Sequence, residues 1–164
     1  LAAHKIVDYA LANSCDVIVF EYLDTKGKKK GSKKQKLSMW KHQDIQNTSE
    51  RLAHSLGIRV AHVCAWNTSK LAYDGSGVVL RGKKISEATP YDICRFQSGK
   101  TYNCDLSASY NIGARYFIRE RLKPLSATVR SSLEAKVPSV KRRTSCVYAD
   151  LRKLSVEIND SKAA

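Results

Sequence analysis

The sequence predicts an α/β fold with a mixed sheet, flanking helices, a small loop-rich insertion and a basic C-terminal tail. Stretches with apolar residues at helical spacing alternate with two short runs rich in β-branched residues. A helix between two such runs is typical of a parallel crossover. The chain has 164 residues, of which 43% are hydrophobic and 27% charged, and this composition excludes a disordered or fibrous protein.

The first 64 residues are predicted to alternate between helices and strands. Apolar residues at helical spacing predict a helix over 2–13, and the run Asp16-Val-Ile-Val-Phe-Glu21 predicts a strand buried on both faces. An amphipathic pattern predicts a helix over 39–56 that ends at Gly57. The next strand is predicted over 58–64.

The second part of the chain begins with turn residues and continues with a strong helical pattern. Glycines and a proline within 65–104 predict loops with short strands over 77–80 and 100–103. A helix is predicted over 106–121, with one stripe formed by Leu106, Tyr110, Ala114 and Phe117.

The charge of the chain is strongly positive and is unevenly distributed. Lys and Arg total 29 against 15 acidic residues, a net charge of +14. Seven lysines lie within 26–36, the segment from Arg119 onward carries a surplus of six, and the remainder comes to +1. Such a field favours nucleic acid as a partner, with solubility or anionic lipid as the alternatives.

The location of the protein is predicted from what the sequence lacks. No apolar run approaches the ~20 residues of a membrane span, and the N-terminus does not resemble a secretion signal. Five widely spaced cysteines are an odd number, which fits free thiols in a reducing compartment. We therefore expect a cytoplasmic protein without a membrane partner.

Two carboxylates are the candidate catalytic residues. Glu21 lies at the carboxyl end of the first strand, where ligands gather in parallel sheets, and Asp105 begins a helix. Two such hard oxygen ligands suit Mg²⁺ or Mn²⁺ and the metal-dependent hydrolysis of phosphodiesters. The alternatives are a salt bridge for Glu21 and an N-cap for Asp105.

Three motifs resemble those of TnpB-type transposon-encoded nucleases and the related compact type V CRISPR effectors. Val17-Ile-Val-Phe-Glu21-Tyr-Leu23 resembles their second RuvC motif, and Trp66-Asn-Thr-Ser-Lys70 resembles the entry to their target-nucleic-acid-binding insertion. Cys104-Asp105-Leu-Ser-Ala-Ser-Tyr-Asn-Ile112 resembles their third RuvC motif. The motifs follow the family order and cover about residues 1–121.

The resemblance implies a partial RNase H-like (RuvC) fold and metal-dependent cleavage of DNA guided by RNA. It divides the chain into a RuvC-like part at 1–64, an insertion at 65–104 and a RuvC-like helix at 105–123. The basic segment that follows, 124–164, has little periodicity and is expected to be a poorly ordered tail with a short helix near 148–157. The resemblance also implies that Glu21 and Asp105 bind Mg²⁺ or Mn²⁺, with DNA and a guide RNA as partners. The expected nucleic-acid-binding residues are Lys26, Lys28, Lys29, Lys30, Lys33, Lys34, Lys36, Trp66, Lys70, Arg95 and Arg115. The alternatives are a place in the core for Trp66 and pairing with Asp105 for the two arginines.

The sequence departs from this family in two ways. The family's first catalytic Asp belongs to a strand upstream of the helix with which the chain begins, so we expect a C-terminal fragment that is inactive alone. The family's four-Cys zinc ribbon is degenerate here, because the matching positions hold Ala72, Gly75, Cys94 and Gln97. Zinc is therefore not expected, and apolar and aromatic contacts should hold the insertion together: those of Tyr73, Val78, Leu80, Tyr91, Phe96 and Tyr102.

Two other functions remain open on the sequence. One is a RuvC-like remnant that binds DNA or RNA without cutting it. The other is a basic structural protein that packs onto RNA, in which Glu21 forms an internal salt bridge and Asp105 caps a helix.

Overall fold

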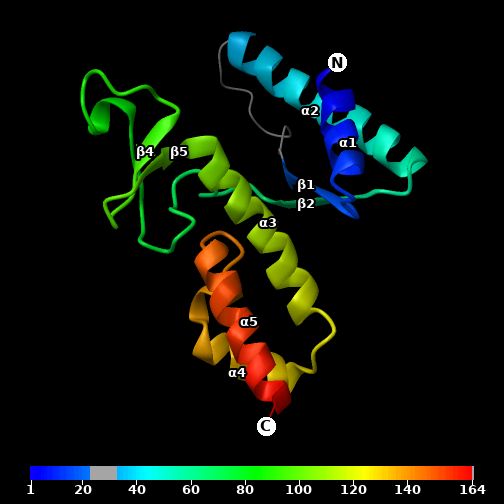
Figure 1. Ribbon diagram of the computed structural model, residues 1–164, viewed down its shortest axis with the longest axis vertical. Helices are drawn as coiled ribbons and strands as arrows, with labels where there is room; N and C mark the ends of the chain where they lie inside the picture. Colours follow the sequence, from blue (N-terminus) through cyan, green and yellow to red (C-terminus); the bar gives the residue numbers. More distant parts are fainter. Residues whose placement is uncertain (23–32, 164) are drawn as a thin grey trace. The chain divides into compact units, whose positions relative to one another are not determined.

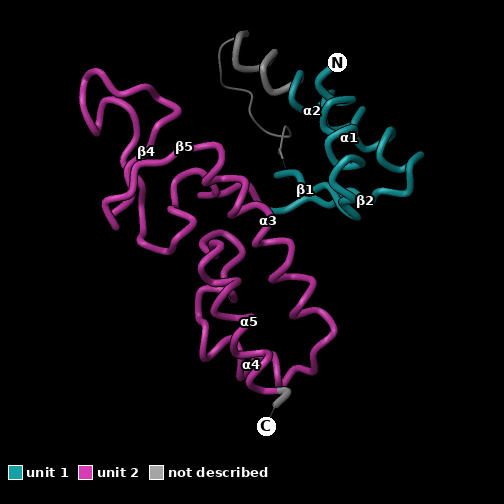
Figure 2. Tube along the Cα trace, in the orientation of Figure 1, with its two compact units in different colours: residues 1–63 teal, residues 64–164 magenta. Residues whose placement is uncertain are grey.

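The computed structural model describes the backbone of residues 1–22 and 33–163, and the side chains of 1–22 and 41–161. It combines helices with two small sheets, a mixed α/β architecture (Figure 1). The chain forms two compact units, residues 1–63 and 64–164, and each is described by itself (Figure 2). Among the described residues, no helix combines the length and apolarity needed to cross a membrane.

The first unit contains the predicted alternation of helices and strands. Its elements are α1 (Ala2–Ala12), β1 (Val17–Tyr22), α2 (Lys33–Ser55) and β2 (Arg59–Cys64), the last of which ends at the boundary with the second unit. Helix α2 starts six residues earlier than its apolar pattern predicts. Gly57 has the positive φ of 75° expected of a residue that ends a helix.

Strands β1 and β2 pair in a two-stranded sheet whose contacts indicate a parallel arrangement. The backbone N–H of Arg59 donates to the carbonyl of Asp16 at 3.1 Å, and the rings of Phe20 and His62 lie 6.0 Å apart. Both contacts join residues with nearly the same sequence offset, as they do only when the strands run in the same direction. The predicted crossover through α2 is therefore present.

The two helices of the first unit cover one face of this sheet. Val7 and Ala10 of α1 form a buried cluster with Ala53 of α2 and with Ile58. Partly buried residues of both strands, Ile18 and Val60 among them, pack against this cluster. Since side chains alternate along a strand, Val17, Val19 and Glu21 project from the opposite face of β1.

The second unit begins with a small antiparallel sheet. Its strands are β3 (Leu80–Arg81), β4 (Ile93–Arg95) and β5 (Thr101–Asn103), in that spatial order, with a 3₁₀ turn η1 (Gly82–Lys84) between the first two. The strand expected over 77–80 is shifted, because Val78 forms only an isolated bridge with Leu71. The apolar core of this insertion contains Ala72, Val79, Cys94, Phe96 and Cys104, with Tyr73 and Tyr102 packed against it.

Helix α3 (Cys104–Leu122) links this insertion to the C-terminal segment. Ala114, Ile118 and Leu122 lie on its buried face. Leu106, Tyr110 and Phe117 are exposed instead, so the expected apolar stripe coincides with the core only at Ala114.

The expectation that the basic tail at 124–164 is poorly ordered is wrong for residues 124–163, which the structure describes. They form α4 (Ala127–Lys136), the 3₁₀ turn η2 (Pro138–Lys141) and α5 (Tyr148–Ala163), which extends the short helix expected near 148–157. Each helix buries few side chains, but together the two helices form one apolar core with α3. The residues that this segment contributes to the core are Leu133, Val137, Val140, Cys146, Leu151 and Leu154.

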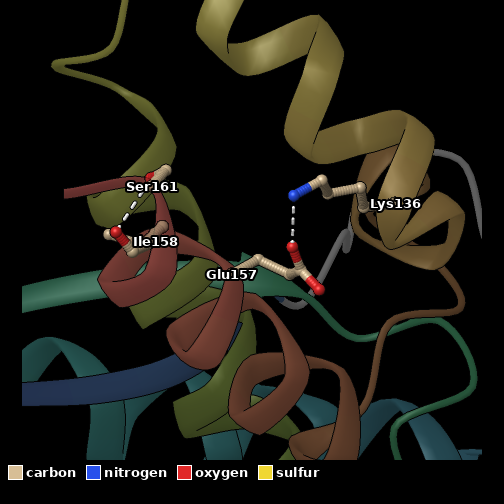
Figure 3. Close-up of polar contacts among 4 residues, drawn as sticks. All are labelled: Lys136, Glu157, Ile158 and Ser161. Atoms are coloured by element: carbon tan, nitrogen blue, oxygen red, sulfur yellow. Dashed lines mark hydrogen bonds and ion pairs between the residues drawn. The ribbon is translucent and has the colours of Figure 1, made fainter. Parts of the chain in front are cut away.

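A polar contact joins the two C-terminal helices at their surface. Lys136 Nζ on α4 lies 2.7 Å from Glu157 Oε2 on α5 (Figure 3). This contact raises the pKa of Lys136 through the hydrogen bond and the charge of Glu157. One turn further along α5, Ser161 Oγ donates to the Ile158 carbonyl at 2.8 Å (Figure 3).

Candidate carboxylate site and nucleic-acid interface

Glu21 is the penultimate residue of β1, which ends at Tyr22. Its side chain projects from the face opposite to the one that α1 and α2 cover, and the residue is half-buried. Gln46 Nε2 on α2 donates to the Glu21 carbonyl oxygen at 3.2 Å, which fixes the end of the strand against the helix. Glu21 is thus held at the carboxyl end of a parallel strand, as predicted.

Asp105 lies in the first turn of α3, but it does not cap the helix. The cap is Asn103, whose Oδ1 accepts from the backbone N–H of Asp105 at 2.9 Å and of Leu106 at 3.1 Å. The N-cap alternative for Asp105 is therefore wrong. Its carboxylate is exposed and has no hydrogen-bond or ion-pair partner among the residues that the structure describes.

The two carboxylates belong to different units, Glu21 to the first and Asp105 to the second. Their convergence on one cation therefore stays a prediction. In the described part of the chain, no group of three or more His, Cys, Asp or Glu side chains is arranged to hold a metal ion. The donor chemistry of the two carboxylates nevertheless fits Mg²⁺, which binds proteins through one or two carboxylates together with water and phosphate.

Arg115 has a different role from the one expected of it. It is only 5% exposed, and its guanidinium donates to the carbonyl oxygens of Cys64, Trp66, Thr144 and Cys146. The prediction that Arg115 binds nucleic acid is therefore wrong, because these backbone carbonyls already accept hydrogen bonds from its guanidinium N–H groups. It positions backbone segments around α3.

Asn111 lies one turn earlier on α3 and is fully buried. Its Nδ2 donates to the carbonyls of Thr68 and Leu71 at 2.9 Å and 2.8 Å, and its Oδ1 accepts from the N–H of Tyr148 at 3.1 Å. Sequence reasoning assigned no role to Asn111. The sequence signal for this role is a polar residue, Asn111, among the apolar positions of the helix predicted over 106–121.

The expected nucleic-acid-binding lysines mostly fall outside what can be described. Lys26, Lys28, Lys29 and Lys30 lie outside the described residues. The backbone of α2 includes the positions of the other three, but their side chains lie outside the described set: Lys33, Lys34 and Lys36.

The remaining expected contacts lie on the second unit and are accessible. Trp66 is 65% exposed, and Lys70 Nζ lies 5.8 Å from the centre of its ring. Arg95 is exposed on β4, between the buried residues Cys94 and Phe96. These three side chains are placed where a polyanion can reach them.

A basic cavity in the insertion was missed by the sequence reasoning. It measures about 820 Å³ and lies beside β3 and η1. Its lining includes Lys70, Arg81, Lys83, Lys84 and Tyr91. Tyr91 was expected in the core of the insertion, but it is 75% exposed, as Val78 and Leu80 are to a lesser extent.

The four positions that match a zinc ribbon do not suit zinc. Ala72 is buried in the apolar core, and Gly75 has no side chain to donate. Cys94 packs in the same core, where burial and a hydrogen bond with Cys104 raise its pKa to about 11. A structural zinc site needs four nitrogen or sulfur ligands, and these four positions supply one sulfur.

Aromatic and polar contacts join the two turns that a zinc ribbon would bring together. The Tyr73 ring lies 5.6 Å from that of Phe96 and 5.4 Å from that of Tyr102. Asp74 accepts hydrogen bonds from Ser98 Oγ at 2.7 Å and from the Ser76 N–H at 2.9 Å. The insertion is therefore held together by a core and by a polar link between its turns.

Comparison with known proteins adds no assignment. The sequence matches no protein-family model. A search of curated proteins likewise gives no match. The functional argument accordingly depends on the residues and their geometry.

Proposed function

We propose that this chain is an RNase H-like (RuvC) nuclease component of the TnpB type, which acts on DNA under the guidance of RNA. In this proposal Glu21 and Asp105 are the carboxylate ligands of Mg²⁺ or Mn²⁺. The observation that carries it is the state of Asp105. Its carboxylate is exposed and without a partner among the described residues, on a helix whose start is already capped by Asn103.

The environment of Glu21 supports the same proposal. Strand β1, helix α2 and strand β2 form a parallel crossover, and Glu21 lies at the carboxyl end of its first strand. This is where α/β sheets gather their ligands. A bound divalent cation would polarise the scissile phosphate and activate the attacking water.

Charge and cysteine chemistry agree with an intracellular partner of nucleic acid. The net charge of +14 favours a polyanion, and all five cysteines are free. We therefore place the protein in the cytoplasm, with DNA and a guide RNA as its partners.

The metal site is tested with Mn²⁺, whose binding to the full chain can be followed by electron paramagnetic resonance. The double variant Glu21→Gln/Asp105→Asn should lose this binding, while each single variant should weaken it. A matched control, Asp8→Asn/Asp92→Asn, removes two exposed carboxylates elsewhere and should leave Mn²⁺ binding unchanged. Equal Mn²⁺ binding by the two double variants would overturn the proposal.

A second candidate function is a binding module that holds nucleic acid without cutting it. The basic cavity beside Tyr91 favours it, because that site requires no metal. A structural RNA-binding protein has less support, since the role that it gave Asp105 as a helix cap belongs to Asn103. Nucleic-acid binding that survives the loss of both carboxylates, together with no Mn²⁺ binding by the unmodified chain, would favour the binding module.

A further inference from the structure

The turn between η2 and α5 carries three adjacent cationic side chains. Lys141, Arg142 and Arg143 are exposed, as is Thr144 after them. This basic turn, residues 141–144, lies beyond the part of the chain, about 1–121, that resembles the TnpB-type nucleases. The resemblance therefore assigns no role to it.

The core of the second unit anchors the basic turn on both sides. Val140 before the turn and Cys146 after it are buried in the apolar core that α3, α4 and α5 share. The buried guanidinium of Arg115 donates to the carbonyl oxygens of Thr144 and Cys146 at 3.1 Å and 3.2 Å. The backbone that bears the three cations is therefore tied to α3.

The basic turn also has hydrogen bonds of its own. The backbone N–H of Arg142 donates to the carbonyl of Ser139 at 3.1 Å. The carbonyl of Arg142 accepts from the N–H groups of Ser145 and Cys146 at 3.1 Å and 3.3 Å. The turn thus presents its cations from a defined backbone conformation.

The acidic side chains of the C-terminal segment compensate other groups. From Arg119 onward the chain has eleven basic and five acidic residues. One acid, Asp150, accepts from the N–H of Val147 at 2.8 Å, and the charge of another, Asp160, acts on Lys136. The other three form ion pairs: Glu120 with Arg119, Glu134 with Arg130, and Glu157 with Lys136. In the described part of the chain, no carboxylate forms an ion pair with the basic turn.

The basic turn offers positive charge without an exposed apolar or aromatic surface. The valines and the cysteine within 137–147 are buried, and this stretch contains no aromatic residue. An amphipathic helix or a membrane surface would need exposed apolar side chains to bind here, and unpaired bases would need aromatic rings. A partner that is held by charge alone, such as a phosphate backbone, fits the turn best.

We infer that the basic turn contacts the phosphate backbone of a nucleic-acid double helix without reading its sequence. Guanidinium and ammonium groups bind phosphate oxygens, and each such contact releases counterions. A double helix carries about one phosphate charge per 1.7 Å of its axis, so it suits three adjacent cations better than a single strand does. This inference rests on the proposed function, since it adds a second contact surface for the nucleic acid on which such a protein acts.

The test is the salt dependence of binding, measured by fluorescence anisotropy of the full chain. The probes are a DNA duplex and an RNA–DNA hybrid of the same sequence, each of about 20 base pairs. In the variant Lys141→Gln/Arg142→Gln/Arg143→Gln, the slope of log K against log salt should become shallower by roughly 2–3, close to one for each lost phosphate contact. Binding to both probes should weaken, because both have a phosphate backbone. A loss with only one probe also supports the inference and identifies the source of the phosphates.

Two matched triple variants separate the basic turn from the total charge of the chain. Lys5→Gln/Arg51→Gln/Arg59→Gln removes three charges from exposed positions of the first unit and should change the slope by less than about one. The variant Lys141→Arg/Arg142→Lys/Arg143→Lys keeps the charges of the turn and should keep the slope of the unmodified chain. Urea unfolding should be alike for all three variants, since the substituted side chains are exposed.

The outcomes distinguish this inference from the proposed function. Equal slopes for the uncharged turn variant and the first-unit variant would overturn the inference, while nucleic-acid binding by the chain stands. Mn²⁺ binding should be unchanged in the turn variant, because Glu21 and Asp105 are intact. If the unmodified chain binds neither probe, the inference fails together with the proposed function.

Discussion

Asn111 and Arg115 lie one turn apart on α3, and both hydrogen-bond to the same two distant stretches of backbone. Asn111 contacts Thr68, Leu71 and Tyr148, and Arg115 contacts carbonyls within 64–66 and 144–146. Through these hydrogen bonds, α3 holds both the segment that enters the insertion and the segment at the start of α5. The position of Asp105 on that helix therefore depends on two side chains that do not belong to the candidate site.

Replacing Arg115 by Lys should destabilise the protein by roughly 3 kcal/mol, because a lysine cannot reach all four carbonyls and leaves buried acceptors without donors. Urea denaturation followed by circular dichroism measures this loss. The matched substitution Arg143→Lys, at an exposed arginine, should change the free energy of unfolding by less than about 0.5 kcal/mol. Equal stability of the two variants would show that the carbonyl contacts of Arg115 contribute nothing.

Substitution of Asn103 should lower the stability of the protein more than substitution of Asp105. Asn103→Ala removes the cap of α3 and should cost about 1 kcal/mol of stability. Asp105→Asn should cost about 0.5 kcal/mol or less, since it removes only a favourable charge near the helix N-terminus. Thermal unfolding of both variants tests this difference. A larger loss for Asp105→Asn would mean that its carboxylate has a structural partner.

Local patterns allowed much of the first unit to be predicted. The β-branched run before Glu21 and the stop at Gly57 depend on neighbouring residues, and the structure confirms the strand and the end of the helix. The expectation that this strand is buried on both faces is wrong, because Val17–Glu21 are half-buried and Tyr22 is exposed. A cap is the alternative role for Asp105 on the sequence because Asp and Asn are equally good caps, and Asn103 lies only two residues away. The sequence pattern could not distinguish between them.

The C-terminal helices and the role of Arg115 could not be predicted in this way. Helix α4 buries only Leu133 within its own length, so its stability comes from α3 and α5 rather than from a local periodic pattern. An arginine in a predicted helix is usually a surface residue, and the carbonyls that surround Arg115 come from segments 29 to 51 residues away. Tyr91 and Arg81 likewise meet only through the fold of the insertion.

Stability should fall at alkaline pH because of Cys94. Burial and a hydrogen bond with Cys104 raise the pKa of Cys94 from its ordinary 9.0 to about 11. Between these pKa values the unfolded chain releases the thiol proton and the folded chain retains it. The free energy of unfolding therefore falls by up to about 1.4 kcal/mol per pH unit. Denaturation curves from pH 8 to 11 should show a steeper loss for the unmodified chain than for Cys94→Ala. Parallel curves would contradict this prediction.

At acidic pH the link between Asp74 and Ser98 should determine part of the stability. Burial acts to raise the pKa of Asp74, but hydrogen bonds from Ser98 and Ser76 and the charge of Lys100 lower it on balance below its ordinary 3.8. The ionised carboxylate therefore stabilises the folded state above pH 3.8, and this contribution is lost as the pH falls through the lower folded value.

Ser98→Ala removes one of the hydrogen bonds that lower the pKa of Asp74, so its stability should depend less steeply on pH below 3.8 than that of the unmodified chain. Denaturant unfolding between about pH 5 and about pH 2.5 measures this difference, because the window spans the ordinary pKa of an Asp and the lower folded one. Ser132→Ala, at an exposed serine on α4, should follow the unmodified chain throughout. If Ser98→Ala also follows it, the hydrogen bond does not hold the two turns of the insertion together.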